Sequence, residues 1–313
     1  MFHESARRLS SAIAIAIATA AAGCAAGAAT SAAPEEPKPL PVENPAPPPL
    51  TYDVFVGDEP GFLVTSTLIM GAHDAILVDG QFTLSNGKRL ADWIAQHGKQ
   101  LKAIWITHAH PDHFFGLEPV LARFPGTPVL STTQVVAAAR ESAPKKVEQW
   151  GPLYKDDLTR KPVIPQPYNE PTLSLDGQQL DIVRLAQADD APATAIHIPT
   201  VGLLVAGDAV YSGVHVWLAE VPTMGLRKAW MTTLDELAAL APTHVVPGHM
   251  KPDAGTEAKS IQETRKYIEL FSQTANGVTD PQVIIDRMKQ AYPDYALPIV
   301  LELAAKATVA NAH

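Results

Sequence analysis

Residues 107–113 read Thr-His-Ala-His-Pro-Asp-His and directly follow Lys102–Ile106, which has the length and apolar character of a buried strand. Three histidines and one aspartate converge on a small volume when such a loop turns back over the carboxyl end of the strand. Imidazole and carboxylate groups are common metal ligands. Alternatively, the histidines are solvated and Asp112 caps a helix that begins at His113. We favour a metal site because similar residues end later strands.

Three other apolar runs also end in a carboxylate or an imidazole. Asp79 closes the run Leu-Val-Asp-Gly, Asp208 closes Val-Ala-Gly-Asp, and His249 closes Pro-Gly-His. Each short motif alone also fits an ordinary turn at the end of a strand. Their order along the chain predicts one site assembled from distant segments.

The composition limits the class of protein. A length of 313 residues with 46% hydrophobic residues suffices for one large α/β domain or two small ones. The net charge of −9, with no cluster of Lys and Arg, argues against nucleic acid as a partner, because phosphates require a basic surface. With Cys24 as the single cysteine, any metal chemistry must use His, Asp and Glu.

The N-terminus predicts export from the cytoplasm. Arg7-Arg8 precede an Ala/Ile run at 12–22 that is too short to span a bilayer as a mature helix. The following Ala-Ala-Gly-Cys resembles a bacterial lipobox, which would make Cys24 a lipidated membrane anchor. The alternative is a secretory signal cleaved within the Ala-rich stretch. We therefore assign residues 1–24 to the signal, residues 25–50 to a stiff Pro/Ala-rich spacer, and the protein to the periplasm or outer membrane of a bacterium.

Alternating strand and helix patterns predict one α/β domain of two similar halves at 51–255, followed by a C-terminal helical extension at 256–313. The extension has three helical segments, broken at 276–280 and at Pro293, and we expect it to pack over or beside the site. The expected strands lie at 52–56, 62–70, 75–78, 103–107, 127–130, 179–186, 193–198, 203–206 and 243–246, and the expected helices before the extension at 84–97, 114–123, 132–149 and 226–240.

The pattern His-x-His-x-Asp-His after a strand, with the later Gly-Asp and Gly-His, resembles the metallo-β-lactamase superfamily over about Tyr52 to Pro252. The resemblance implies a four-layered αββα sandwich with the metals at one edge. It also implies that Asp208 bridges two metals, that His249 is the last metal ligand, and that Asp79 supports the metal ligands without binding metal itself.

The sequence departs from this family at the third histidine of the first metal. The corresponding stretch reads Gln-Ala-Asp-Asp-Ala-Pro-Ala-Thr at 187–194, and Asp189 falls where the histidine is expected. A carboxylate oxygen also binds zinc, so we predict Asp189 as the ligand, with Asp190 as the alternative and a vacant position as a third interpretation.

The resemblance implies one or two zinc ions that activate water, and the carboxylate in place of imidazole leaves room for manganese or iron. Asp112 is expected to orient the water and to pass a proton to the leaving group. The predicted ligands are His108, His110 and Asp189 for one metal, Asp112, His113 and His249 for the other, and Asp208 between them.

Tyr211 follows Asp208 in Gly-Asp-Ala-Val-Tyr, which resembles the superfamily's acyl-homoserine lactonases. The resemblance implies that the Tyr211 phenol donates to the substrate carbonyl; the alternative is a packing role. His215 fits either the pocket or the core, and core packing is the default for a histidine among apolar residues. The same choice between substrate wall and core applies to Trp217, Met224 and Trp230, while four further histidines are predicted to be structural: His73, His97, His197 and His244.

These observations favour a metal-dependent hydrolase of an ester, lactone or related acyl compound, with a small-molecule substrate as the partner. Two alternatives remain open. One is a β-lactamase, because export places the protein where such antibiotics act. The other is a non-hydrolytic metal-binding protein or an iron redox protein, which the carboxylate at Asp189 would suit. The oligomeric state does not follow from the sequence.

Overall fold

The computed structural model describes residues 47–311. The predicted signal, Cys24 with its possible lipid anchor, and most of the predicted spacer lie outside the described residues. Packed structure begins at Leu50, which is buried between the two sheets of the fold. Within the described residues, no helix is long and apolar enough to cross a membrane.

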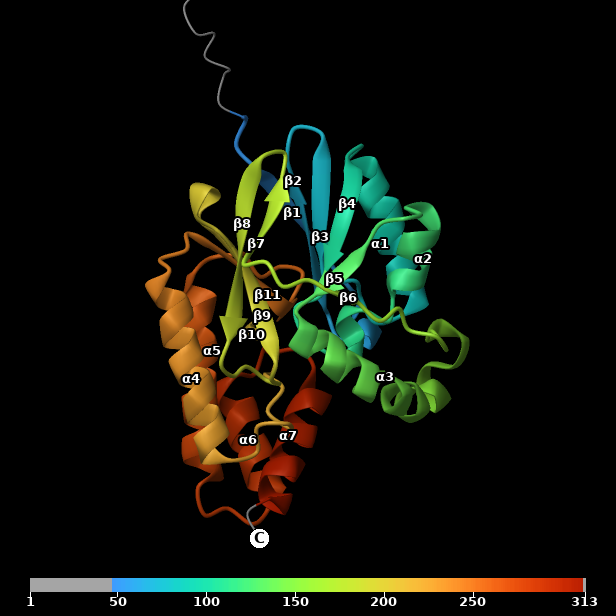
Figure 1. Cartoon of the computed structure of the whole chain (residues 1–313). Coiled ribbons are helices and arrows are strands. Elements are labelled where there is room, and N and C mark those ends of the chain that lie inside the picture. Colours follow the sequence, from blue (N-terminus) through green and yellow to red (C-terminus); the bar gives the residue numbers. More distant parts are fainter. Residues whose placement is uncertain (1–46, 312–313) are drawn as a thin grey trace, which may run out of the picture. The chain divides into compact units, whose positions relative to one another are not determined.

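The first sheet has six strands in sequential order, as Figure 1 shows. The first three strands pair antiparallel, and the remaining strands add in parallel. The strands are β1 (Thr51–Val56), β2 (Thr65–Met70), β3 (Asp74–Val78), β4 (Gln100–Trp105), β5 (Val129–Ser131) and β6 (Gln166–Pro167).

The second sheet has five strands in the order β11-β10-β9-β8-β7. Its strands pair antiparallel except for β10 and β11, which are parallel neighbours, so their carboxyl ends lie at the same edge. The strands are β7 (Thr172–Leu175), β8 (Gln178–Leu185), β9 (Ala193–Ile198), β10 (Leu203–Ser212) and β11 (His244–Met250).

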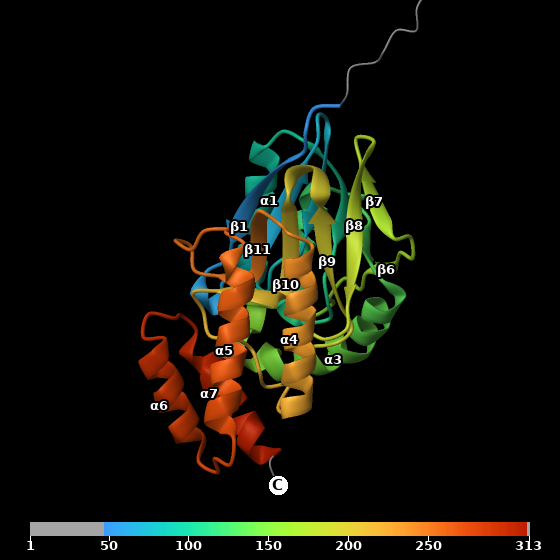
Figure 2. The same ribbon diagram turned by 90° about the vertical axis from the view of Figure 1, so that its left-hand side faces the viewer.

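Helices cover the outer face of each sheet, and the two inner faces pack on each other (Figures 1 and 2). The core between the sheets joins Ile76 and Trp105 of the first sheet to Ile196, Leu203 and Val246 of the second. The first sheet is covered by α1 (Leu84–Gln96), α2 (Leu117–Arg123) and α3 (Thr133–Tyr154), and the second by α4 (Met224–Ala239) and α5 (Lys259–Ala275). The chain therefore has the four-layered αββα architecture that the sequence predicted.

The amphipathic helices show why the sequence folds this way locally. In α1, the Thr83 side chain accepts a hydrogen bond from the Asn86 backbone N–H and so caps the helix. Leu90, Ala91 and Ile94 then recur at helical spacing on one face and are buried against the first sheet.

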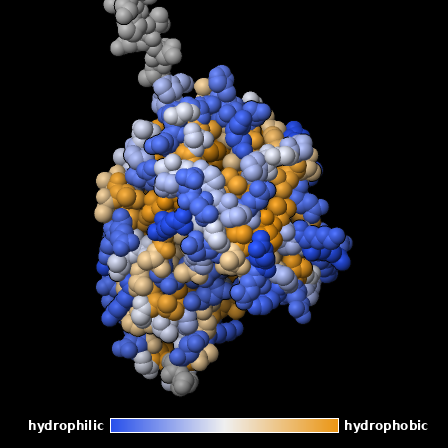
Figure 3. All heavy atoms as spheres, in the orientation of Figure 1, coloured by the Kyte–Doolittle hydropathy of each residue, from blue (hydrophilic) through white to orange (hydrophobic). Residues whose placement is uncertain are grey.

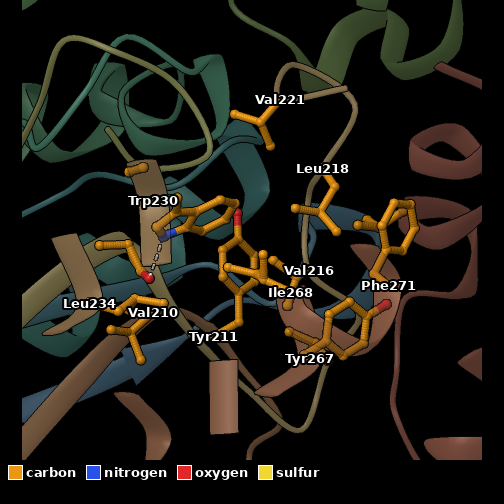
Figure 4. Close-up of a cluster of buried hydrophobic side chains, with 14 of the residues drawn as sticks. Val210, Tyr211, Val216, Leu218, Val221, Trp230, Leu234, Tyr267, Ile268 and Phe271 are labelled. Atoms are coloured by element: carbon orange, nitrogen blue, oxygen red, sulfur yellow. Dashed lines mark hydrogen bonds between the residues drawn. The ribbon is translucent and has the colours of Figure 1, made fainter. Parts of the chain in front are cut away.

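Two more helices, α6 (Pro281–Ala291) and α7 (Pro298–Ala310), lie together next to α5 at one end of the sandwich (Figure 2). The chain before α7 is tied to the segment after β10, because the Ala296 N–H donates to the Gly213 carbonyl and the His215 N–H donates to the Ala296 carbonyl, both at 3.0 Å. These helices share a core with the second sheet: Figure 4 shows Tyr267, Ile268 and Phe271 of α5 in one cluster with Tyr211.

Some details differ from the predictions. Strands β6 and β7 are short and were not predicted, and β10 continues to Ser212 instead of ending at Ala206. A break in the pairing of β10 with β11 around Gly207 lets the strand carry polar Asp208 and still resume its ladder at Tyr211. In Figure 3, patches of apolar residues alternate with polar ones over the face shown, as on most soluble domains.

Candidate metal centre

The structure brings four predicted ligands into one buried group: His108, His110, Asp189 and Asp208. Their ligand atoms all lie within 4.8 Å of one another. Asp189 Oδ2 lies 3.0 Å from His110 Nδ1 and 3.9 Å from His108 Nε2. Asp208 Oδ2 lies 3.7 Å from His108 Nε2. Residues from three distant stretches of sequence thus meet at the strand ends.

A second group consists of Asp112, His113 and His249, again with ligand atoms within 4.8 Å of one another. His249 Nε2 lies 3.4 Å from Asp112 Oδ2. Asp208 connects the two groups, since its Oδ2 is 3.0 Å from His249 Nε2 and its Oδ1 is 3.1 Å from His113 Nε2. Asp208 therefore lies between the two groups, where a bridging carboxylate is expected.

Three buried atoms of these groups form no hydrogen bond of proper geometry among the described residues: His108 Nε2, His113 Nε2 and Asp208 Oδ1. The last two lie 3.1 Å apart but do not meet that geometry. A buried polar atom without a partner is costly, and such atoms are normally satisfied by protein, water or an ion. All three belong to groups whose nitrogen and oxygen atoms suit a divalent cation. The residues present therefore fit a bound divalent metal.

The charges inside the site are unbalanced. Burial and the neighbouring Asp208 carboxylate together raise the pKa of Asp189 to about 8, against the opposing effect of His110. Burial alone would also raise the pKa of Asp208, but the imidazoles of His249, His113 and His108 outweigh it and hold that pKa well below its usual range. In the metal-free protein, burial is outweighed by the neighbouring carboxylates, which hold the pKa values of His110 and His113 well above their usual range, so these imidazoles carry protons that a divalent cation can replace.

Asp79 holds the loop of residues 107–113 in place. Its carboxylate accepts hydrogen bonds from the Thr107 N–H at 2.9 Å and from the Thr107 hydroxyl at 2.8 Å. The same carboxylate lies 2.9 Å from His113 Nδ1, so His113 Nε2 points to Asp208. Such an outer carboxylate orients a histidine and increases its basicity as a metal ligand.

Close backbone approach explains the Gly-His motif of β11. A Cβ atom on Gly248 would lie 1.9 Å from Asp208 Oδ1 and 2.7 Å from the carbonyl carbon of Gly207. Only glycine lets β11 pass Asp208 so closely while it delivers His249 to the site. His249 is also fixed through its other ring nitrogen, because its Nδ1 lies 2.6 Å from the Phe62 carbonyl oxygen.

The two adjacent aspartates occupy different surroundings. Asp189 is fully buried and faces His110 and His108. Asp190 keeps 31% of its side chain exposed, and its Oδ2 is 3.9 Å from His110 Nε2, on the far side of that ring. The geometry of the first group therefore includes Asp189. Asp190 belongs instead to a separate set with His110 and Glu220, whose ligand atoms also lie within 4.8 Å of one another, and two members of this set, Asp190 and Glu220, are partly exposed.

Tyr211 and Asp112, the two residues predicted to take part in catalysis, both line the pocket above these groups. The Tyr211 hydroxyl donates to Asp208 Oδ2 at 2.8 Å, and its ring stacks on His249 with centroids 5.2 Å apart. Tyr211 also packs near Trp230, which is fully buried in the core and donates to the Ala209 carbonyl (Figure 4).

Glu220, which lies in the segment between β10 and α4, was not among the residues predicted for the site. Its carboxylate contacts His110 Nε2, and it also pairs with Lys146 of α3 at 3.3 Å. Like Asp79 behind His113, it orients a histidine of the site, with His110 Nδ1 toward Asp189. No local motif marks Glu220, because it reaches the site only through the course of that segment.

A pocket of about 590 Å³ opens above the two groups. At its base lie His110, Asp112, Asp208 and His249. Its walls come mainly from α3, α7 and the segment after β10, and their apolar residues are Phe62, Phe82, Trp150, Leu153, Trp217, Leu297, Ile299, Val300 and Leu303.

The remaining candidates divide between pocket and core. His215 and Trp217 line the pocket, whereas Trp230 is core and Met224 is exposed outside the pocket lining. Four histidines belong to neither metal-ligand group, as predicted: His73, His97, His197 and His244.

The sequence profile of the metallo-beta-lactamase superfamily matches residues 60–249. A search of the curated proteins finds no match. Similar solved structures include a metallo-beta-lactamase family protein from Thermus thermophilus, with 19% identity, coverage of 84% of this chain and 93% of that one, and a TM-score of 0.59.

A beta-lactamase domain protein from Burkholderia ambifaria is 17% identical over 88% of this chain and 92% of its own, with a TM-score of 0.59. A metallo-beta-lactamase from Pontibacter korlensis is 18% identical over 73% and 97%, with a TM-score of 0.50. At these identities the structures show a common fold. With the profile match, which spans more than half of the sequence, they establish that the chain belongs to the metallo-beta-lactamase superfamily.

Proposed function

We propose that this chain is a metal-dependent hydrolase of esters, lactones or related acyl compounds that carry a sizeable apolar group. The observation that carries the proposal is the position of the histidine and aspartate groups at the base of a pocket with mostly apolar walls. Pockets of this size bind small molecules, with apolar walls for affinity and a few polar groups for orientation.

In this proposal His108, His110 and Asp189 hold one divalent cation, and Asp112, His113 and His249 hold a second. Asp208 lies between both sets. Zinc is the proposed metal, and the carboxylate of Asp189 also suits manganese or iron. When bound, such cations lower the pKa of a water molecule and polarise a carbonyl group.

Tyr211 and Asp112 supply the protein's own chemistry at the base of the pocket. Burial and the nearby Asp189 and Asp208 carboxylates raise the pKa of Tyr211 well above its usual value, so its phenol keeps the proton and acts as a hydrogen-bond donor. In this structure the phenol donates to Asp208 Oδ2 at 2.8 Å. With the Asp208 carboxylate engaged by a bound metal, the hydroxyl proton would be free to turn to the oxygen of the reacting carbonyl, where negative charge develops, and we assign it to that oxygen. Asp112 is positioned beside His249 to orient the attacking water and to transfer a proton to the leaving group.

The pocket favours an ester or lactone over a β-lactam. β-Lactam antibiotics carry a carboxylate beside the reacting amide, and outside the proposed metal centre this carboxylate would need a basic side chain. Lys146 is the one lysine or arginine among the described residues that line this pocket, and it is already paired with Glu220. The apolar walls match an alkyl or aryl group instead. We also propose export and, through Cys24, attachment to a membrane, on the strength of the N-terminal sequence.

The test is a substrate panel on the metal-replete full chain: 4-nitrophenyl butyrate and octanoate, γ- and δ-lactones with alkyl substituents, and nitrocefin. We expect hydrolysis of octanoate to exceed that of butyrate, no turnover of nitrocefin, and loss of activity on chelation that added zinc, manganese or iron restores. Turnover of nitrocefin with inert esters and lactones would replace the proposal by a β-lactamase. A protein that binds metal but turns over none of the panel would contradict it.

A further inference from the structure

His215 follows β10 and is 1% exposed, yet it lines the pocket. Its backbone is fixed, since its N–H donates to the Ala296 carbonyl at 3.0 Å and the neighbouring Val214 forms a bridge with Ala296. It lies outside both metal-ligand groups. The His215 imidazole is therefore a rigidly held polar group in a wall that is otherwise mostly apolar.

The ring is also fixed by Tyr267 of α5. His215 Nδ1 lies 2.8 Å from the Tyr267 hydroxyl oxygen. Tyr267 is 1% exposed, and Nδ1 is the one hydrogen-bond acceptor that its hydroxyl meets among the described residues. A buried phenol needs an acceptor for its proton. If Nδ1 carried the ring hydrogen, the buried Tyr267 hydroxyl would have no acceptor for its own proton in the part of the chain that the structure describes, so we assign Tyr267 as the donor and Nδ1 as the acceptor.

This arrangement determines where the histidine carries its proton. Because Nδ1 accepts from Tyr267, the neutral ring has its hydrogen on Nε2. Burial, with a smaller contribution from the charge of Lys289, lowers the pKa of His215 to about 4, so the ring is neutral at physiological pH.

The hydrogen on Nε2 has no partner within the protein. Nε2 makes no hydrogen bond within residues 47–311. The protein does not enclose this atom completely, so it can be reached from the cavity that His215 lines. A buried donor that faces only the cavity is satisfied by water or by a ligand.

We infer that His215, fixed by Tyr267, donates an Nε2–H hydrogen bond to a second oxygen of the substrate, separate from the reacting carbonyl. The inference rests on the proposed function and narrows its substrate class. The substrate is an acyl compound whose apolar part carries an additional neutral acceptor, such as a keto, ether or amide oxygen. A site that hydrogen-bonds such an oxygen discriminates against the analogue without it, because the buried donor is then left unpaired.

Two substitutions of His215 test the roles of its two ring nitrogens one at a time. His215→Gln extends an amide donor toward the position of Nε2. His215→Asn retains a polar partner for Tyr267 near Nδ1 and removes the donor that faces the cavity. The probes are 4-nitrophenyl decanoate and three of its keto derivatives, with the keto group at carbon 4, 6 or 8.

We expect wild-type protein to prefer at least one keto ester over plain decanoate by about 3- to 10-fold in kcat/KM, mainly through KM, as one neutral hydrogen bond provides. His215→Asn should lose this preference and His215→Gln should keep part of it. A preference for no keto ester, or an equal preference in wild type and His215→Asn, would overturn the inference.

A second measurement needs neither the variants nor catalytic turnover. Its result therefore does not depend on the folding of a variant or on the proposed function. Long-range ¹H–¹⁵N correlation spectra of the metal-replete wild type report which ring nitrogen of His215 carries hydrogen. We expect the Nε2–H form, and a larger shift of this resonance with the preferred keto acid than with decanoic acid. An Nδ1–H form, or equal shifts with both acids, would overturn the inference. Hydrolysis of none of the four esters, with the expected spectra, would reject only the proposed function.

Discussion

At the scale of single residues, Asp208 is the residue on which the proposed site depends most. It is the carboxylate that contacts His108, His113 and His249. Asp79 and Glu220 act one step further out, where each orients one histidine. The sequence indicated Asp208 and Asp79 because both end apolar strands, whereas nothing in the local sequence distinguishes Glu220 from an ordinary exposed glutamate.

We predict that Asp208→Asn lowers the metal content of the purified protein by at least half and lowers hydrolysis more than about 100-fold. Substitution of residues that only hydrogen-bond the metal ligands already lowers metal affinity or activity about 10- to 100-fold. Metal analysis and ester hydrolysis measure the two effects. Asp156→Asn is the matched control, since the Asp156 side chain is 98% exposed and, within the part of the chain that the structure describes, pairs only with Arg160. Full metal content in active Asp208→Asn protein would contradict the assignment.

The pH dependence of metal binding follows from the same contacts. Burial lowers the pKa of His110 and His113, but the neighbouring carboxylates outweigh it and hold both well above the usual 6.5 in the metal-free protein. A protonated imidazole cannot bind metal, so protons compete with the metal at every pH below these raised values. Affinity is therefore lost as the pH falls through a range above 6.5, earlier than for an ordinary histidine.

Competition with a chelator of known pH dependence tests this prediction. Between about pH 6 and about pH 8, we expect the apparent affinity of the metal-free protein to rise at least about tenfold per pH unit, because binding releases protons from the histidines. An affinity that is constant over this range would show that the histidines are not protonated in the metal-free site.

At the scale of elements, the close approach of β10 and β11 is what delivers Asp208 and His249 to one place. The two strands are parallel neighbours, and Gly248 passes Asp208 without room for a side chain. Parallel strands end at a common edge, which is why motifs about 40 residues apart in the sequence could be predicted to meet.

We predict that Gly248→Ala lowers both metal content and stability, by about 1–3 kcal/mol in the free energy of unfolding, since the added Cβ overlaps Asp208. Chemical denaturation and metal analysis measure the effects. Gly225→Ala on α4 is the control, because its Cβ would meet nothing closer than 4.0 Å. Loss of stability with unchanged metal content would show that β11 can move without disturbing the site.

The C-terminal helix α7 contributes apolar walls to the pocket. Leu303 lines it and is 37% exposed, so its substitution costs little stability. We expect Leu303→Ser to lower kcat/KM for 4-nitrophenyl octanoate about 3- to 10-fold, as loss of part of a leucine contact implies, and that for butyrate less than about 2-fold.

Leu240→Ser is the matched control for Leu303→Ser. Leu240 is equally exposed, at 37%, but lies at the end of α4 and outside the pocket lining. Equal effects of the two substitutions on octanoate would place the apolar part of the substrate elsewhere.

At the scale of the whole molecule, strands that end in polar ligands predicted the convergence of the site, whereas the αββα fold was implied by the family resemblance that those motifs carry. The sequence predicted that the C-terminal helices pack over or beside the site, but not the pocket itself, because its walls from α3, α7 and the segment after β10 meet only through tertiary packing. Strand β6 escaped prediction because a two-residue bridge has no periodicity. The role of His215 depends on Tyr267, 52 residues away in the sequence.

The most direct test of the account is a crystal structure of the metal-replete protein with anomalous diffraction data. The account predicts a metal peak about 2.0–2.2 Å from the ligand atoms of His108, His110 and Asp189. A second peak is expected beside Asp112, His113 and His249 where two ions bind, with Asp208 between the peaks. A protein that hydrolyses esters without a peak at either position would contradict the account.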